Sequence, residues 1–195
     1  LGFLATWFLY SSLVESYVMP GPWAVVSRLG LMFTDIHEVG HMFYSFAHII
    51  SAVIISFFIG SFLAFFAHYL DVFDTMVHGR LSPFLNSFSG IGWTFLAIIW
   101  FGISDVTVVF VISMVLIPFA IINMREALIN LDKERIEMSV SFTRSGWRRF
   151  RLVILPSLYP FIFATIRISF GVAWKVALTA ELFGGNTGLG YMLNL

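Results

Sequence analysis

Residues 37–41 have the sequence HEVGH. It matches a pattern whose histidines bind catalytic zinc in metalloproteases. In the pattern H-E-x-x-H, two histidines one helical turn apart bind the metal, and the glutamate activates a water molecule. His37 and His41 would be the ligands here and Glu38 the general base. His48 falls on the same helical face, because eleven residues make about three turns. One possible function of this chain, to be weighed against the others below, is therefore that of a membrane-embedded zinc metalloprotease.

The sequence around the HEVGH pattern argues against that chemistry. Gly40 weakens the helix that would hold the ligands, no H-x-x-G-x-x-H continuation follows, and a five-residue pattern arises readily by chance. No Ser-His-Asp triad or pair of carboxylates is readable elsewhere. The glycine loop, residues 184–190, lacks the G-K-[ST] of a phosphate-binding loop, so it predicts no nucleotide site. We expect no catalytic residue and no bound metal.

The composition indicates an integral membrane protein. The 195 residues are 59% hydrophobic and 11% charged, with a mean hydropathy of +0.91. A soluble domain has about 25% charged residues, so this chain has too few polar side chains to cover its surface in water. The net charge of zero argues against a nucleic-acid partner, and the absence of cysteine excludes disulfides and thiolate chemistry. A secondary transporter would need inverted repeats, and none is readable.

Residues 125–155 are the one long polar segment, and seven of the eleven Lys and Arg residues lie in it. Such a concentration of positive charge predicts a cytoplasmic location. One interpretation is a solvated loop that satisfies this rule. The aromatic residues Phe142, Trp147 and Phe150 favour a second interpretation, a surface that docks on a soluble partner. Ser145 should cap a short helix there. The seven basic residues are Arg125, Lys133, Arg135, Arg144, Arg148, Arg149 and Arg151.

Five apolar segments predict membrane-spanning helices. The first is shorter than the about 20 residues needed to cross a bilayer, so we expect upstream residues to complete it. Pro118 should kink the fourth. Pro156 suits the first turn of the fifth, where its missing N–H would be unpaired anyway. The segments are residues 1–14, 45–67, 81–104, 106–123 and 156–182.

The residues between these segments should form shorter elements. Residues 23–44 are predicted to be short amphipathic helices at a membrane surface, with aromatic side chains at the interface. Residues 71–80 should make a short polar turn, and the glycine loop a tight bend near an outer gate. Counting spans from the cytoplasmic segment places residues 15–44, Asp105 and the glycine loop outside. Gly60 and Ala64 should permit close helix packing.

Three ionisable residues, Arg167, Lys175 and Glu181, lie in the fifth apolar segment. A charge at membrane depth is costly and usually faces the bundle interior or a water-filled cavity. Helical spacing places Arg167, Trp174 and Lys175 on one side, which predicts a pathway in which two cations favour an anion. The alternative is structural. Arg167 would pair with a carboxylate or with carbonyl groups, while Lys175 extends to the outer interface.

The sequence Glu137-Met138-Ser139, followed by Thr143 and by Val-Ile-Leu-Pro at residues 153–156, resembles the signature E-A-A-x3-G-x9-I-x-L-P of ABC-importer permeases. The span of 20 residues from glutamate to proline matches. IIWFGIS at 98–104 and AELFGGNTGLGYM at 180–192 resemble the branch that imports nitrate, sulfonates, taurine and related anions. The chain departs from the signature where Thr143 replaces its glycine and where Met138 and Ser139 replace its alanines.

The resemblance implies an all-α type I ABC-importer permease bundle. A single permease domain, residues 1–195, would hold five visible transmembrane helices and a cytoplasmic coupling-helix loop, and a sixth helix would follow Leu195. The protein would be multi-pass in the bacterial inner membrane. Two copies would line one pathway for a small organic or inorganic anion, which a periplasmic or extracellular binding protein delivers.

The resemblance also implies how such a chain is driven. The coupling helices of residues 125–155 would dock on a cytoplasmic ATP-binding cassette subunit, which binds ATP and Mg and hydrolyses the nucleotide. This chain would bind no cofactor and would not itself be an enzyme. Arg167 and Glu181 match residues common in the family, whereas Lys175 does not. The expected docking residues are Glu137, Met138, Ser139, Thr143, Gly146, Trp147, Phe150, Leu155 and Pro156.

Overall fold

The computed structural model of the chain describes residues 2–14, 18–131, 138–139, 141, 143 and 145–194, with the backbone alone for residues 2–5. The described part is helical and contains no strand, so the predicted all-α class is confirmed. The chain divides into two compact units, Leu1–Phe43 and Tyr44–Leu195, and each is described by itself.

The first unit holds two short helices and the start of a third. Helix α1 spans Gly2–Leu13 and α2 spans Pro22–Met32, with Pro22 in the first turn of α2. The indole N–H of Trp7 donates a hydrogen bond to the carbonyl of Pro20, 3.2 Å away. Arg28 forms an ion pair with Glu38.

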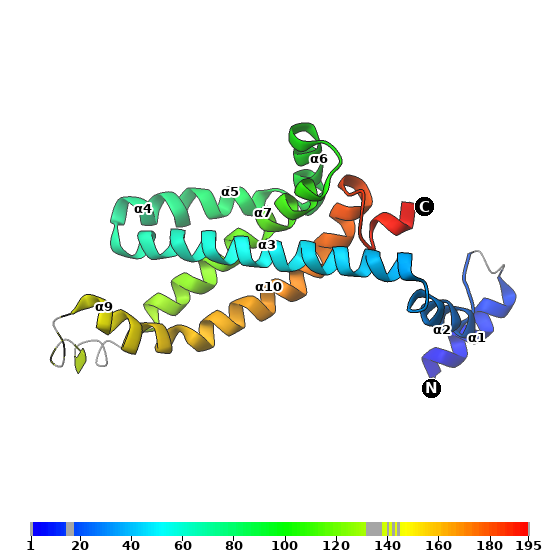
Figure 1. The fold of residues 1–195 in the computed structure, drawn as a ribbon, viewed down its shortest axis with the longest axis horizontal. Coiled ribbons are helices and arrows are strands. Elements are labelled where there is room, and N and C mark those ends of the chain that lie inside the picture. Colours follow the sequence, from blue (N-terminus) through cyan, green and yellow to red (C-terminus); the bar gives the residue numbers. More distant parts are fainter. Residues whose placement is uncertain are drawn as a thin grey trace. The chain divides into compact units, whose positions relative to one another are not determined.

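The second unit is a bundle of long helices with shorter ones at their ends (Figure 1). The first of these helices, α3, begins in the first unit. The last of the long helices, α10, continues directly from α9 and η2. The elements are α3 (Ile36–Tyr69), α4 (Asp71–Met76), η1 (Val77–Leu81), α5 (Ser82–Ser87), α6 (Gly90–Phe101), α7 (Asp105–Ile129), α9 (Gly146–Arg149), η2 (Phe150–Ile154), α10 (Leu155–Gly184) and η3 (Tyr191–Asn194).

Each of the five predicted apolar segments contains a helix, and three of the described helices are long and apolar enough to cross a membrane. These are α3, α7 and the continuous helix Gly146–Gly184. A fourth crossing is counted if α4–α5 and α6, which are bent by 87° from each other, form one broken span. Pro156 lies in the first turn of α10, as predicted.

The prediction of a polar turn at residues 71–80 was wrong. These residues are helical, and the backbone is extended only at Leu70, with φ −130° and ψ 108°. Asp71 and Asp74 lie in the first turn of α4, where the positive end of the helix dipole favours negative charge. The acidic residues therefore start a helix and do not interrupt one.

The helix within the third predicted segment, residues 81–104, is broken in two. The break comes after Ser87, and α6 starts again at Gly90. The hydroxyl of Ser89 accepts a hydrogen bond from the Gly92 N–H, 3.2 Å away, which satisfies a donor that the new helix end leaves free.

Two helices extend beyond the predicted boundaries. Helix α3 begins at Ile36 and includes residues that were predicted as a separate surface helix. Helix α7 continues to Ile129, so the polar segment starts inside a helix. Arg125 and Glu126 are good helix formers, and charge alone does not end a helix.

The core of the second unit lies between α3, α6, α7 and α10. The fully buried side chains Ile49, Ile112, Leu116 and Ile121 belong to it. A methyl group on Gly60 would overlap the Cβ of Ala120, so glycine is what lets α3 and α7 approach here. The predicted role of small residues in helix packing is confirmed at this position.

Candidate functional site

Helix α10 carries a candidate site at each end. Thirty residues make a helix about 45 Å long, which is more than the thickness of the hydrocarbon core. The polar segment joins its first turn through α9 and η2, and the glycine loop follows its last turn (Figure 1). If α10 crosses the membrane, these two segments lie on opposite sides of it.

At the C-terminal end of α10, the carboxylate of Glu181 is the centre of a buried polar cluster. Glu181 has 0% of its surface exposed. Its own partners come from α3 and from the glycine loop, and Asp105 in the first turn of α7 joins the cluster through His48 and Thr187. We call this set the Glu181 cluster; it comprises Ser45, His48, Asp105, Glu181 and Thr187 with the backbone N–H groups of Leu189 and Gly190.

Both oxygens of the Glu181 carboxylate are engaged. The Ser45 hydroxyl donates to Oε2 at 2.8 Å, and the Gly190 N–H donates to the same oxygen at 2.9 Å. The Nδ1 of His48 lies 3.0 Å from Oε1. Carboxyl oxygens accept hydrogen bonds, so the Ser45 hydroxyl and the Gly190 N–H suit Oε2, and His48 suits Oε1 when its proton is on Nδ1. Hydrogen bonds of this kind compensate the cost of burying a charge.

The cluster extends from Glu181 to the start of α7. His48 Nε2 lies 3.5 Å from Asp105 Oδ1, so its ring bridges two carboxylates. The Thr187 hydroxyl donates to the same Asp105 oxygen at 2.7 Å, which connects the glycine loop to α7. The Ser45 hydroxyl, which donates to Glu181, also accepts from the Leu189 N–H at 2.8 Å.

Glycines make this close packing possible. A Cβ atom on Gly188 would overlap the Glu181 carboxylate, and one on Gly190 would overlap the Leu178 carbonyl. Gly188 also has φ +105°, a conformation that other residues rarely adopt. The predicted tight bend is confirmed at Gly188.

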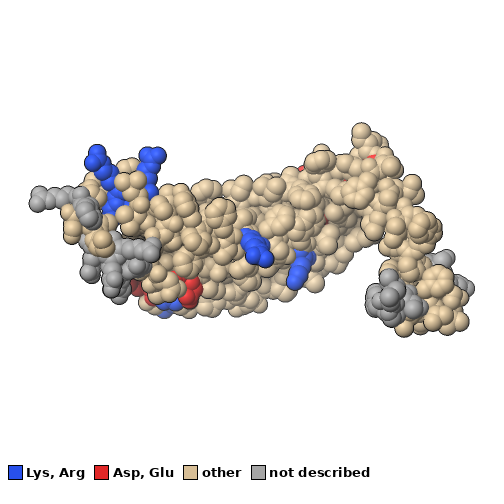
Figure 2. Space-filling view, turned by 90° about the horizontal axis from the view of Figure 1, so that it is seen from below, with Lys and Arg blue, Asp and Glu red and all other residues tan. Residues whose placement is uncertain are grey.

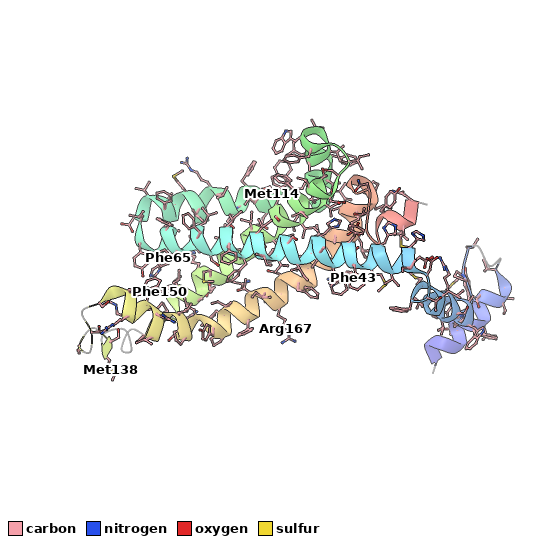
Figure 3. The ribbon with its side chains drawn as sticks, viewed as in Figure 1. Phe43, Phe65, Met114, Met138, Phe150 and Arg167 are labelled. Atoms are coloured by element: carbon pink, nitrogen blue, oxygen red, sulfur yellow. The ribbon has the colours of Figure 1, made fainter. Side chains whose placement is uncertain are left out.

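Midway along α10, Arg167 and Lys175 present charges of a different kind. Both side chains are exposed, and in the described part of the chain neither has a carboxylate within ion-pair distance. The Arg167 side chain points away from the other helices in Figure 3. Eight residues separate the two positions, or about 12 Å along the axis. Of the two kinds of partner in the structural alternative for Arg167, a carboxylate or carbonyl groups, the described residues do not provide the carboxylate.

Trp174 and Glu181 do not share the surroundings of these two cations. Trp174 is half-buried, and its ring meets Phe46 edge-on at a centroid distance of 5.1 Å. Glu181 belongs to the Glu181 cluster and has no exposed surface. Of the four residues predicted for a pathway, Arg167 and Lys175 are thus the two with freely exposed side chains.

The polar segment is partly described, and Glu137 lies outside the described residues. Met138 is 59% exposed and Ser139 is buried. Thr143 takes no positive φ, and its hydroxyl accepts a hydrogen bond from the Ser145 N–H at 3.3 Å. A threonine at the signature's glycine position is therefore accommodated by a side-chain hydrogen bond, with no left-handed backbone.

Helix α9 is the described docking candidate in this segment. The Ser145 hydroxyl accepts from the Arg148 N–H at 3.4 Å, so the predicted cap is confirmed. The rings of Trp147 and Phe150 stack with centroids 5.9 Å apart, and Trp147 is 71% exposed. Gly146 has open space around it. Figure 2 shows Lys and Arg atoms gathered at the end of the unit that carries α9.

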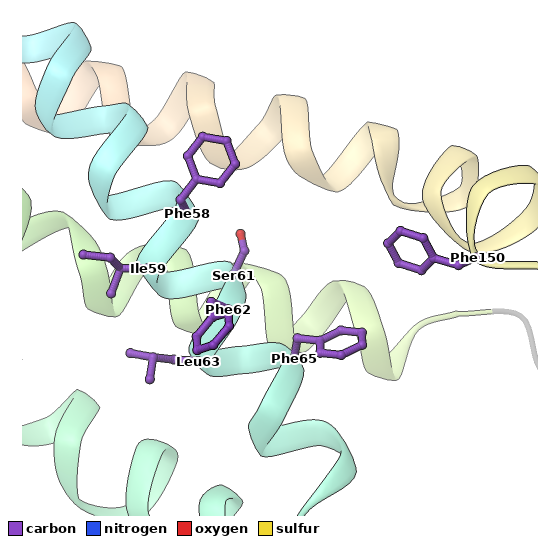
Figure 4. A pocket seen from close by; sticks show the side chains of 7 residues that line it. All are labelled: Phe58, Ile59, Ser61, Phe62, Leu63, Phe65 and Phe150. Atoms are coloured by element: carbon purple, nitrogen blue, oxygen red, sulfur yellow. The ribbon is translucent and has the colours of Figure 1, made fainter. Parts of the chain in front are cut away.

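An apolar hollow of about 620 Å³ lies between α3 and the start of η2 (Figure 4). Its lining contains one polar side chain, Ser61, so it suits hydrocarbon and not a charged solute. Its lining residues are Phe58, Ile59, Ser61, Phe62, Leu63, Phe65 and Phe150.

The sequence of the chain matches a known family over most of the second unit. Residues 57–195 match the family described as "Binding-protein-dependent transport system inner membrane component". The chain belongs to this family. The predicted resemblance to ABC-importer permeases, the multi-pass inner-membrane location and the role in transport are thereby confirmed.

Individual relatives come from several bacteria. The chain is 33% identical over 97 residues to the putative aliphatic sulfonates transport permease protein SsuC of Escherichia coli, a match that covers 50% of the chain and 37% of that protein. It is 27% identical to a probable ABC transporter permease of Brucella melitensis, covering 96% of the chain and 75% of the relative. The taurine transport system permease protein TauC of E. coli is 28% identical over 60% of the chain and 44% of its own length.

The HEVGH pattern of this family member does not form a metal site in the described residues. No group of three His, Cys, Asp or Glu side chains is placed there to hold a metal ion. The carboxylate of Glu38, the predicted general base, pairs with Arg28. His48, which was predicted to share the histidine face, instead contacts Glu181 and Asp105.

Sequence reasoning missed the Glu181 cluster as a unit. Glu181 was assigned to a pathway, His48 to a metal pattern, and Ser45 to no site. A signal was present, because a histidine and a glutamate inside apolar helices each need a buried partner. Their separation of 133 residues hid the pairing.

Proposed function

We propose that this chain is the membrane-spanning subunit of an ATP-driven importer that carries a small anion into the cytoplasm. The observation that carries the proposal is the family match over residues 57–195. The three long apolar helices, with a broken fourth span, supply the membrane-crossing part. Because the chain covers 37% of the length of its SsuC relative from E. coli, the substrate and the whole assembly are part of the proposal.

The relatives and the cations of α10 together support an anionic substrate. Relatives are named for aliphatic sulfonates, taurine and bicarbonate. Arg167 and Lys175 are exposed cations in a membrane-spanning helix. No carboxylate of the described residues lies within ion-pair distance of either side chain. A cation at membrane depth is usually placed in a water-filled cavity. We assign the pathway to this side of α10, lined by two copies of the chain.

The partner that supplies the energy would dock at the other end of the α9–η2–α10 rod. Residues 125–155 would lie in the cytoplasm and fit a groove of an ATP-binding cassette subunit, where ATP and Mg bind. The exposed Trp147–Phe150 stack suits such a contact, since aromatic residues are enriched where partners bury surface. A binding protein would deliver the substrate at the glycine-loop end.

Reconstitution tests the transport function. The full-length permease would be purified with its ATP-binding cassette subunit and placed in proteoliposomes with the binding protein and one of four labelled anions: taurine, an alkanesulfonate, bicarbonate or nitrate. ATP-dependent accumulation of at least one anion is expected, and it should stop when the phosphate-binding lysine of the ATPase is replaced. If uptake continues without a working ATPase, the proposal is wrong.

Site-specific cross-linking tests the docking surface. A photoreactive amino acid at Trp147 should capture the ATP-binding cassette subunit. The matched control is Leu193, which is 74% exposed at the opposite end of α10 and should not capture it. Capture from Leu193 and none from Trp147 would reverse the proposed orientation.

A further inference from the structure

The Glu181 cluster is not explained by anion transport alone. Glu181 is an acidic residue in an importer proposed for anions, and its carboxyl group is fully enclosed by protein. It therefore neither attracts nor touches a solute in this conformation. A buried charge is nevertheless costly to keep, which calls for a role that a hydrophobic residue would not fill.

The bonds of the cluster join parts of the chain that are far apart in sequence. Ser45 and His48 attach α10 to α3, across 136 and 133 residues. The Gly190 N–H and the Leu189 N–H attach the returning loop to the same two groups, Glu181 and Ser45. The Ser104 N–H donates to the Gly184 carbonyl at 3.0 Å, which ties the last turn of α10 to the start of α7.

The packing around Glu181 leaves the loop no space to move closer to α10. At Gly188 and Gly190 the backbone is so close to α10 that a single methyl group would overlap it. Any displacement of the loop away from Glu181 would remove the Gly190 N–H from the carboxylate and the Leu189 N–H from Ser45. Such a loss is unfavourable in a medium that contains little water.

We propose that Glu181 is a positioning residue that, with Ser45 and His48, fixes the glycine loop to α3 and to the C-terminal end of α10. The loop then moves together with α10 during transport and does not act as a gate of its own. Motion produced at the α9 end of the rod would reach the opposite end, about 58 Å away for its 39 residues, as a movement of one rigid body. This inference rests on the proposed function, because it assigns the loop a part in transport.

A reversible disulfide tests whether the loop moves independently. Residues 1–195 contain no cysteine, so Asp105→Cys with Thr187→Cys introduces the only two thiols there, and any cysteine elsewhere in the full-length permease is first replaced. The two native side chains touch, with Thr187 Oγ1 2.7 Å from Asp105 Oδ1. In proteoliposomes, the oxidised protein should import at a rate within about twofold of the same protein after reduction. A loss of uptake on oxidation that reductant restores would overturn the proposal, because the loop would then have to open.

Rescue provides the positive test. Ser45→Ala removes the hydroxyl that bonds both Glu181 and Leu189, and should lower uptake roughly three- to tenfold by freeing the loop. In the triple variant with both cysteines, oxidation should restore most of this loss and reduction should remove it again. The same assembled molecules are compared before and after oxidation. A defect of folding alone would therefore not be reversed by forming the disulfide. Full uptake by Ser45→Ala would overturn the proposal.

The two proposals fail in different ways. If the cysteine-free parent imports nothing, the transport function is wrong. The yield of the engineered disulfide between positions 105 and 187 in membranes needs no transport, and it should fall when Ser45→Ala is added. If the yield is unchanged by Ser45→Ala, the loop is not held by Ser45, whatever the substrate. If Ser45→Ala does not assemble, the oxidised and reduced double-cysteine protein still decides between a fixed loop and a gate.

Discussion

Two kinds of charge lie on the single helix α10. Near its C-terminal end, Glu181 is buried and accepts hydrogen bonds from donors on α3 and on the glycine loop. Midway along the helix, Arg167 and Lys175 are exposed and have no carboxylate partner among the described residues. The lipid environment makes both arrangements costly, so each has to be compensated in some way.

The two arrangements differ in which groups offset the free-energy cost of placing a charge in the membrane. For Glu181 these groups belong to the fold, because they are side chains of α3 and backbone N–H groups of the glycine loop. For Arg167 and Lys175 they have to come from water, from a second copy or from a passing anion. A charge that is satisfied within the chain stabilises one conformation, whereas a charge left unpaired by the chain is available to a ligand. Thermal stability should therefore respond differently in the two classes when leucine replaces the ionisable residue.

Glu181→Leu should produce the largest loss. It leaves the Gly190 N–H, the Ser45 hydroxyl and His48 Nδ1 without their acceptor, and breaking a buried polar pair typically costs about 3–5 kcal/mol. We expect a large decrease in folded permease after detergent extraction, measured by size-exclusion chromatography and thermal unfolding.

Glu181→Gln is the matched control for the loss of charge. Its amide oxygen can accept from Ser45 and Gly190, while its amide N–H₂ donates to His48 Nδ1 in the tautomer protonated on Nε2. We expect this variant to remain close to the parent in thermal stability. If it were as unstable as Glu181→Leu, the charge and not the hydrogen-bond geometry would hold the cluster together.

Gly188→Ala should cause the next largest loss of stability. Its methyl group would overlap the Glu181 carboxylate, and alanine is strained at φ +105°. A loss of roughly 2 kcal/mol or more in the free energy of unfolding is expected, as for other backbone conflicts of this kind. Gly171→Ala is the control, because it lies on the exposed face of α10 with nothing within 4 Å. Gly171→Ala should be neutral or slightly stabilising. Equal losses in the free energy of unfolding at both positions would contradict the close packing of Gly188 against Glu181.

Much of this architecture could be predicted from the sequence, since hydropathy locates the apolar helices, although the helix that carries Pro156 already starts at Gly146. The errors came where charge was taken to end a helix. Asp71 and Asp74 begin α4, and Arg125 continues α7, because helix ends depend on hydrogen bonds and packing as well as polarity. The break after Ser87 depends on the cap that Ser89 supplies, which hydropathy does not detect.

The site was predicted unevenly for a related reason. The cap of α9 is a local feature, and Ser145 followed by a short basic helix was enough to predict it. The contact between His48 and Glu181 is a tertiary feature, and helical spacing carries no information about which distant residue faces which. The histidine pattern in α3 suggested neighbours one turn away, whereas the structure pairs His48 with α10 and α7.

Lys175→Leu tests the role of the exposed cations. We expect a moderate loss of transport and no loss of stability. Removing an unpaired charge from a membrane-facing or water-facing surface should leave thermal unfolding unchanged or raise it slightly. Uptake should fall about tenfold, equivalent to about 1.4 kcal/mol of lost stabilisation of the anion in transit.

Lys175→Arg keeps the cation and is the control for Lys175→Leu. It should retain most of the uptake in proteoliposomes, although arginine and lysine are not fully interchangeable. Arg167→Leu should behave as Lys175→Leu does. If either leucine variant lost stability to the extent of Glu181→Leu, that cation would be structural and the contrast along α10 would disappear.

Ser145→Ala extends the comparison to the start of the same rod and should have the smallest effect. Loss of an N-cap costs about 1 kcal/mol of local helix stability. Because α9 has four residues and is proposed to dock on the ATPase, this loss should lower transport-coupled ATP hydrolysis roughly two- to fivefold without changing thermal unfolding. Ser89→Ala removes an equivalent cap from α6, away from the polar segment, and so should affect folding more than coupling. Equal coupling defects from the two caps would show that α9 is not specifically the docking helix.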